Sequence, residues 1–402
     1  MTNEQKYFLN ILKQHLNHES SALHGGIDWD EMLAIAGRHN VEGIIYMQCR
    51  KFLPDRTAFE KRYAAQIYYS KMREQMTTHL KKTLAGNDFL LLKGAVVADL
   101  YPIPLLRTMG DVDVLIHPEE RAAVHEKLLK AGFILELESS SVWVYHYGAS
   151  HVEVHDNLIH ASLGGDQARA YFENVWKYTK NGDLDWDFHF LFMIQHLKGH
   201  LVSSGVGFRQ FMDIAIVTEK VNLNWKWILE EAKKIGLERF VLTVLAMNQR
   251  WFGIVPKSKV WNEEAGEKKM KADAFTLKLP QIDDDFYERA TSKIFKDGVF
   301  GHENEENQNI DVSRVMMYEG GSIHTAKRKL FFRQLFPQYY TMCRLPYCRY
   351  VRRSKLLLPA AWVHRIFYRF FNSRHRRGFI DRVFISGNDV KQRKDLLDEW
   401  GL

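Results

Sequence analysis

The chain has 402 residues, of which 46% are hydrophobic and 26% are charged. This is the composition of an ordinary globular protein that can bury a sizeable core and hold two or three domains. The formal net charge is +7, from 56 Lys and Arg against 49 Asp and Glu, and it does not by itself indicate nucleic-acid binding.

The cysteines and the apolar segments indicate in which cellular compartment the protein is expected. Cys49, Cys343 and Cys348 are odd in number and lack paired spacing, so we expect neither a disulfide framework nor a structural zinc site. The N-terminal segment has no apolar core of a secretory signal, and the apolar segment from Leu356 is interrupted by Pro359 and basic side chains. We expect a cytoplasmic protein without a transmembrane span.

The first 87 residues read as helical. Apolar residues recur every three or four positions in KYFLNILKQHL, in WDEMLAIAGRHNVEGIIYMQC and in FEKRYAAQIYYSKMREQMTTHLKKTL. Gly86 and Asn87 stop the last helix, and the run FLLLK from Phe89 has the length of a buried strand. The architecture is therefore expected to change at about residue 88.

Strands and short helices follow in alternation. AVVADLY predicts a short helix, Pro102 and Pro104 a loop, and DVDVLI from Asp111 a strand. A helix from Pro118 to Lys130 precedes the strands FILELE, VWVYHY and HVEVH. We predict an α+β fold, with a mixed β-sheet core between N-terminal and C-terminal helical regions.

The remaining pattern suggests four regions. Residues 186–245 are helical again, and residues 257–309 are polar and mainly looped, with one or two helical pieces. We expect an N-terminal helical region at 1–87, a catalytic core at 88–180, a helical substrate or nucleotide domain at 181–310 and a basic, aromatic helical region at 311–402.

The chemistry concentrates on two of the predicted strands. Asp111 and Asp113 are two residues apart, so both carboxylates project from one face, and Glu153 and His155 do the same on a second strand. Three acids can hold two magnesium ions together with substrate phosphates. The competing interpretations are a loop-capping Asp pair and an exposed edge-strand Glu153.

Residues between the strands could bind phosphate. Gly94 lies where a strand turns into a helix, so it could let the backbone approach an anion, and Lys93 adds a positive charge. Arg107 could reach a triphosphate or fix Asp111 through paired hydrogen bonds. Each of these features also occurs for purely local reasons.

The segments LLKGAVVADLYPIPLLRTMGDVDVLI and HVEVHDNL together resemble the polymerase-beta-like nucleotidyltransferase superfamily, in particular its bacterial branch of uncharacterised nucleotidyltransferase family proteins. That branch shows Lys-Gly, Tyr-Pro, an Arg, Gly-Asp-x-Asp and a later acid-x-His in this order. The resemblance implies that Asp111, Asp113 and Glu153 are the catalytic metal ligands. By the same resemblance Gly94 occupies the place of the family's glycine motif. Gly110, which directly precedes Asp111, is expected to lie at the nucleotide. This chain departs from the family in having Glu at the third acid and Ala95 after the glycine.

The resemblance continues into HFLFMIQHLKGHLVSSGVGFRQFMDIAIV, which supplies His196, His200, Arg209 and Asp213. His196 and His200 share one helix face, which suits a metal or a substrate, although no third ligand is evident and structural or nucleotide-contacting roles are favoured. With His155 and Arg209 they are the candidate substrate contacts. Arg209 and Asp213 are predicted to form an intrahelical ion pair.

The segment 327–377 has fourteen Lys and Arg and no Asp or Glu, interleaved with aromatic residues. It could pack as a helical bundle on the catalytic region, lie on an anionic membrane at the inner face, or bind nucleic acid, which is not favoured.

We therefore expect a transferase that moves a nucleotidyl group from ATP or another nucleoside triphosphate to an unidentified acceptor hydroxyl and releases pyrophosphate. Adenylyl is the nucleotidyl group that we expect by default. Two magnesium ions, or manganese, would assist. The alternative is an inactive nucleotide-binding interaction module, membrane-associated through its basic C-terminal region.

Overall fold

A computed structural model describes residues 1–139, 142–159, 166–203, 205–256, 260–262, 269–271, 277–299, 323–337, 339, 342, 345–371 and 387–402. The chain divides into two compact units. Unit 1 comprises Met1–Leu201, Gly205–Gly301 and Glu399–Leu402, and unit 2 comprises Val202–Ser204 and His302–Asp398. The four regions expected from the sequence stay a prediction.

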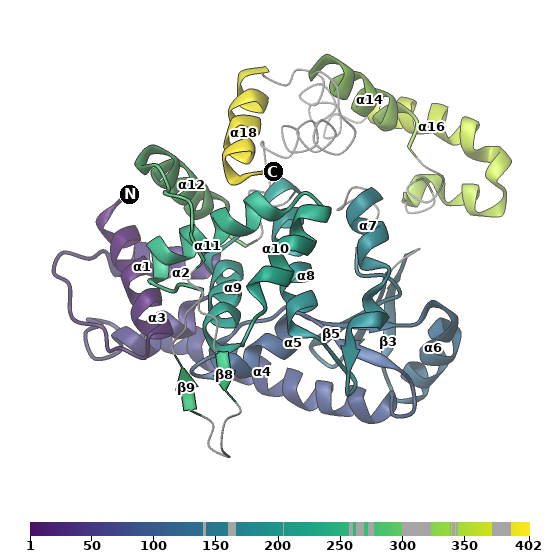
Figure 1. Ribbon diagram of the computed structural model, residues 1–402. Coiled ribbons are helices and arrows are strands. Elements are labelled where there is room, and N and C mark those ends of the chain that lie inside the picture. Colours follow the sequence, from purple (N-terminus) through teal and green to yellow (C-terminus); the bar gives the residue numbers. More distant parts are fainter. Residues whose placement is uncertain are drawn as a thin grey trace. The chain divides into compact units, whose positions relative to one another are not determined.

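Four helices precede the sheet, as predicted: α1 (Asn3–Leu16), α2 (Trp29–His39), α3 (Glu42–Cys49) and α4 (Thr57–Thr83) (Figure 1). Thr2 and Gln5 form a capping box that starts α1. The pattern predicted as one helix over 29–49 is split, because Asn40 takes the left-handed conformation and ends α2.

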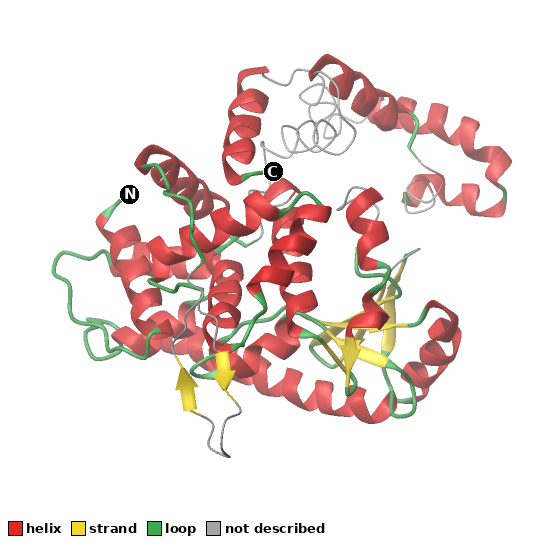
Figure 2. Cartoon of the chain, viewed as in Figure 1, coloured by secondary structure: helices red, strands yellow, loops and turns green. Residues whose placement is uncertain are grey.

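The sheet of unit 1 has five strands: β1 (Phe89–Leu91), β2 (Asp111–Ile116), β3 (Ile134–Glu138), β4 (Val142–Tyr147) and β5 (Ser150–His155). Their spatial order is β1-β2-β5-β4-β3. β2 and β5 run parallel and the other neighbours run antiparallel, so the sheet is mixed (Figure 2). The predicted α+β class is confirmed.

Alternation along the central strands divides apolar from acidic side chains. Val112, Val114 and Ile116 of β2, with Val152 and Val154 of β5, are buried in one core with residues of α4 and of α6 (Arg121–Lys130). The intervening residues project from the opposite face of the sheet, because successive strand side chains alternate. The acids of both strands therefore share the face that these two helices leave open.

Short elements connect the strands and lead out of the sheet: α5 (Gly94–Val97), η1 (Ala98–Leu100), η2 (Pro104–Leu106), η3 (Pro118–Glu120), α7 (Asp166–Phe172), η4 (Val175–Tyr178), β6 (Thr179–Lys180) and β7 (Asp183–Leu184). Prolines at the starts of η2 and η3 supply the φ angle that a helical turn needs.

The helical region after the sheet is confirmed: α8 (Trp186–Ser203), α9 (Phe208–Lys220), α10 (Trp225–Lys234) and α11 (Glu238–Phe252). In the polar stretch 257–309, α12 (Asp284–Asp297) is one of the expected helical pieces. A hairpin of β8 (Val260–Asn262) and β9 (Lys269–Lys271) was not predicted. Residues 257–259, 263–268, 272–276 and 300–309 lie outside the described residues.

Unit 2 contains α14 (Ile323–Leu335), η5 (Pro346–Arg353), η6 (Lys355–Leu357) and α16 (Leu358–Phe371), and α18 (Gly387–Trp400) ends the chain's helices. Met342, Cys348, Val351 and Ala361 form its small apolar core. Residues 372–377 of the basic segment, and some side chains before them, lie outside the described residues. Within the described ranges, no helix has both the length and the apolar character needed to cross a bilayer.

We predict that Leu128→Ala lowers the free energy of unfolding by about 2 to 5 kcal/mol, because the side chain is fully buried between α6 and the sheet. Leu129→Ala is the matched control, since the neighbouring Leu129 is 45% exposed and the expected change is within about 0.5 kcal/mol. Chemical denaturation measures both. Equal losses would contradict the placement of α6.

Candidate active site

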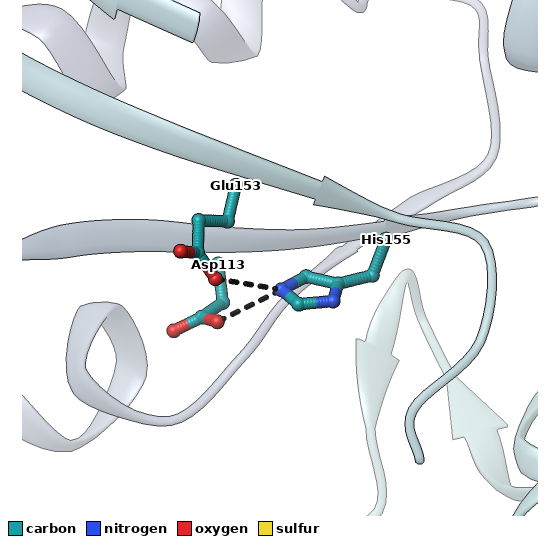
Figure 3. A group of neighbouring side chains, drawn as sticks. All are labelled: Asp113, Glu153 and His155. Atoms are coloured by element: carbon teal, nitrogen blue, oxygen red, sulfur yellow. Dashed lines mark hydrogen bonds and ion pairs between the residues drawn. The ribbon is translucent and has the colours of Figure 1, made fainter. Parts of the chain in front are cut away.

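The acids of β2 and β5 meet on one face of the sheet because the two strands are parallel neighbours. Asp113 lies opposite Glu153 in the strand register, and Asp111 precedes Asp113 by one pleat. Figure 3 shows Asp113, Glu153 and His155 pointing toward one another. Asp111, Asp113, Glu153 and His155 all line one pocket of about 490 Å³. Asp113 and Glu153 thus converge, Asp111 lines the same pocket, and their shared role as metal ligands stays a prediction.

Asp113 is the centre of the contacts in this cluster. Its side chain is 7% exposed, and Oδ1 lies 2.6 Å from Lys93 Nζ and 3.0 Å from His155 Nε2. The same His155 nitrogen lies 3.4 Å from Glu153 Oε2. Two cationic or donating groups therefore hold the buried carboxylate in place.

The two aspartates titrate in opposite directions. Burial raises the pKa of Asp111 to about 6, and repulsion from Asp113 and Glu153 adds to the shift. Burial also opposes ionisation of Asp113, but the positive charge of Lys93 and the hydrogen bond from His155 outweigh it and hold that pKa far below its usual value. Two neighbouring carboxylates of one pocket thus differ in how readily they ionise.

His155 is influenced by the same acids. Burial disfavours its charged form, whereas the hydrogen bonds to Asp113 and Glu153 favour it, and the net effect raises the pKa of His155. The ring therefore offsets some of the carboxylate charge when no other cation is bound.

Lys93 has the backbone conformation that a glycine would be expected to have. Its φ is +48° and its ψ is −118°, and L-residues rarely adopt a positive φ. The Lys93 N–H donates to His189 Nε2 at 3.0 Å. Burial, followed by repulsion from Lys93, lowers the pKa of His189 to about 4, so this ring is a neutral acceptor. His189 fixes the turn that aims Lys93 at Asp113.

Gly94 has a structural role besides the predicted approach to phosphate, which stays a prediction. A Cβ at Gly94 would collide with the guanidinium group of Arg107, so the close approach that the glycine permits is to a side chain of the protein. The helix that Gly94 begins, α5, has only four residues.

Arg107 is paired with Asp213 of α9. Its Nη2 donates to Asp213 Oδ2 at 2.7 Å and its Nε to Oδ1 at 3.2 Å, while Tyr101 Oη donates to Oδ1 at 2.7 Å. All three side chains are buried. The predicted pairing of Arg107 with Asp111 is wrong, and so is the predicted Arg209–Asp213 pair, because Asp213 is bound from the loop between α5 and β2.

Arg209 instead donates to the backbone oxygen of Thr108. Burial, and then repulsion from Arg107, lowers the pKa of Arg209. Arg73 of α4 lies close enough to both guanidinium groups that burial and their repulsion lower its pKa to about 10. Within the described residues neither Arg73 nor Arg209 has an ion pair with a carboxylate. The wall of the site near Asp111 is therefore positively charged.

His196 and His200 form a neutral pair on α8. Their Nε2 atoms lie 2.9 Å apart. Burial is the main cause that lowers the pKa of His200 to about 4 and the pKa of His196 well below its usual value. Among the described residues no third His, Cys, Asp or Glu joins them as a metal-binding group. The favoured interpretation, structural or nucleotide-contacting side chains, is compatible with this geometry and stays a prediction.

The pocket gathers every candidate residue that the sequence suggested: Lys93, Gly94, Arg107, Gly110, Asp111, Asp113, Glu153, His155, His196, His200 and Arg209. Gly110 has open space where a side chain would lie. His189 and Arg73 were not predicted from the sequence, because neither belongs to a sequence motif. Each affects the site only through a neighbouring residue. The apolar wall of Leu158, Phe192, Met193 and Leu197 was not predicted either.

The donor set fits a divalent cation. Oxygen atoms of Asp113 and Glu153 and a nitrogen of His155 lie within 4.8 Å of one another. Burial raises the pKa of Asp111, repulsion from Asp113 and Glu153 adds to the shift, and a bound cation would relieve this repulsion. Asp111, Asp113 and Glu153 are the residues that could hold it.

The Asp111 pKa predicts how the protein responds to pH without divalent cations. Between about pH 4 and 6 the folded protein keeps a proton on Asp111 that the unfolded chain has lost, so stability falls as the pH rises through this window. We expect Asp111→Asn to be more stable than wild type at pH 7, by on the order of 1 to 3 kcal/mol. The difference should shrink toward pH 4.

Denaturant unfolding in a chelating buffer at several pH values measures this difference. Asp183→Asn, at an exposed carboxylate outside the pocket, is the control and should follow wild type at every pH. A loss of stability in Asp111→Asn that is the same at pH 4 and pH 7 would show that Asp111 is not destabilised by its neighbours.

A family model described as an uncharacterised nucleotidyltransferase matches residues 25–253, more than half of the chain. No curated protein and no solved structure matches the chain. The matched range contains the acidic strands, Lys93 and the two helices that face them across the pocket. The chain therefore belongs to this family of nucleotidyltransferases.

Proposed function

We propose that this protein transfers a nucleotidyl group, adenylyl from ATP, to an acceptor hydroxyl and releases pyrophosphate. The observation that supports it most is the convergence of Asp111, Asp113 and Glu153 from parallel strands at a pocket that also holds Lys93 and Arg209. Acids that hold cations beside basic groups that hold phosphate are the combination that phosphoryl-group chemistry needs.

The triphosphate side of the pocket is the positively charged wall. Arg209 is half-buried at the pocket, and Arg107 and Arg73 raise the positive potential around it. Asp213 is hydrogen-bonded to Arg107, so a triphosphate would give the Arg209 guanidinium group a direct anionic partner. Lys93, on its fixed turn, would provide a second contact to phosphate oxygens.

Magnesium, in two ions with manganese as a substitute, would be held by Asp111, Asp113 and Glu153 and would offset the charge on the reacting phosphate and the leaving pyrophosphate. Glu153 is the most exposed of the three side chains that Figure 3 draws. It is therefore the carboxylate best placed to receive the proton of the acceptor hydroxyl.

The rest of the pocket can accommodate the nucleoside. Leu158, Phe192, Met193 and Leu197 form an apolar wall, and a volume of about 490 Å³ lies in the range of small-molecule sites. The neutral His196 and His200 would add hydrogen bonds without attracting phosphate. The pocket thus has an acidic, a basic and an apolar part, one for each part of the donor.

The test is transfer of label from ATP. With ATP labelled at the α phosphate, a divalent cation and a cell lysate, wild type should label an acceptor, whereas ATP labelled at the γ phosphate should not. Asp113→Asn should reduce transfer by at least about a hundredfold, because a carboxylate that would hold the cation becomes a neutral amide. Asp183→Asn is the control, and undiminished transfer by Asp113→Asn would refute the assignment.

A second candidate is a nucleotide-binding module without catalysis. The observation that favours it is that the Lys93 ammonium lies 2.6 Å from Asp113 Oδ1, the atom that a catalytic cation would need. If Lys93 stayed there, ATP could bind while Asp113 remained unavailable. Cation-dependent ATP binding with no transfer of the α label to any lysate component would support this function over the first.

We further propose that unit 2 contacts an anionic membrane surface. On α16 the apolar side chains of Val363, Ile366 and Phe367 are exposed at helical spacing, and Leu356 just before the helix is 90% exposed. The same segment, 327–377, has fourteen basic residues and no acid. Of these exposed side chains only Phe367 could stack on a base, whereas all four can enter a lipid interface, so a lipid interface explains this surface better than nucleic acid.

Flotation of the full chain with vesicles tests the membrane contact. Vesicles rich in phosphatidylglycerol should carry the protein, and neutral vesicles should not. The triple variant Val363→Ser, Ile366→Ser and Phe367→Ser should lose at least about tenfold in binding, because each side chain contributes about 1 kcal/mol or more when buried. Leu129→Ser, at an exposed apolar residue of unit 1, is the control. Unchanged flotation of the triple variant, or equal binding to neutral vesicles, would contradict the proposal.

A further inference from the structure

We propose that His155 is a direct ligand of the divalent cation, together with Asp113 and Glu153, and that this nitrogen makes the site prefer manganese to magnesium. The inference rests on the proposed function, since it concerns the cation of the same site. It adds a ligand that the sequence assigned to substrate contact, and a preference that three carboxylates alone would not give.

The geometry brings the imidazole into the cation site. Glu153 and His155 are two residues apart on β5 and project from one face, and Asp113 faces them from β2. His155 presents Nε2 to both acids, at 3.0 Å from Asp113 Oδ1 and 3.4 Å from Glu153 Oε2 (Figure 3). One atom from each of the three side chains lies within 4.8 Å of the other two. A single ion can therefore reach all three.

The chemistry of this donor set points to manganese. Magnesium strongly prefers oxygen ligands, whereas first-row transition ions gain affinity from an imidazole nitrogen. Two carboxylates, with further oxygens expected from a triphosphate, keep the set rich in oxygen. A set dominated by oxygen with one nitrogen suits manganese better than zinc or copper, which favour more nitrogen or sulfur.

The role that must be distinguished is positioning. His155 could instead orient Asp113 and Glu153 through hydrogen bonds without touching the ion. A positioning role would weaken magnesium and manganese binding to a similar extent, because both ions use the same carboxylates. A ligand role would weaken manganese selectively when the nitrogen is replaced by an oxygen.

The first experiment is pulsed electron paramagnetic resonance of manganese bound to the full chain without nucleotide. Wild type should show coupling to a directly bound imidazole nitrogen, and His155→Gln should not. The absence of nitrogen coupling in wild type would overturn the proposal, and so would its persistence in His155→Gln, which would point to His196 or His200. This readout does not depend on catalytic activity.

The second experiment measures both affinities by calorimetry. His155→Gln keeps an oxygen ligand, so we expect its preference for manganese over magnesium to fall about tenfold relative to wild type. His151→Gln is the control, because His151 is on the same strand but lies outside the pocket and pairs with Glu136. An unchanged preference in His155→Gln would overturn the proposal.

The two proposals can fail separately. Manganese binding through nitrogen, without transfer of the α label from ATP, would leave the ligand assignment standing and remove the transferase. If transfer required Asp113 but wild type showed no nitrogen coupling, the transferase would stand and the assignment of His155 as a ligand would be removed.

Discussion

Mutual repulsion among three carboxylates is the constraint on which the site depends. The parallel pairing of β2 with β5 places Asp113 beside Glu153, and Asp111 follows from the alternation of the strand. This repulsion adds to the effect of burial in raising the pKa of Asp111. The protein tolerates it because the strands themselves are held from the other face, where their valines pack under α4 and α6. The core thus supports a cluster that would otherwise be unfavourable.

A second buried charge pair holds the opposite wall. Arg107 and Asp213 are 106 residues apart in sequence and join the loop before β2 to α9. Breaking one partner of such a pair leaves an uncompensated charge in the interior, which costs about 3 to 5 kcal/mol. Gly94 leaves the space that the guanidinium group occupies. The glycine of the motif therefore has a structural role that its position beside a strand does not reveal.

The sequence predicted what depends on local patterns. Alternation identified the strands of the sheet, and the spacing of Asp111 with Asp113, and of Glu153 with His155, predicted a shared face correctly. The resemblance to nucleotidyltransferases agrees with the family match. Local patterns could not show which acid Arg107 would bind, because i,i+4 spacing favoured Arg209 as the partner of Asp213. The Asp213 carboxylate instead binds residues from another part of the chain.

The positive φ of Lys93 was equally hidden, because lysine is not a residue from which a left-handed turn is expected. Its consequence is that one ammonium group has two prospective partners. In the absence of other ligands Lys93 neutralises Asp113 at 2.6 Å. A divalent cation on that oxygen would repel the ammonium group, while a triphosphate would offer it new acceptors. Binding of the cation and of the triphosphate should therefore favour each other. When both bind, the Lys93 ammonium group exchanges the Asp113 carboxylate for a phosphate group, so it keeps an anionic partner.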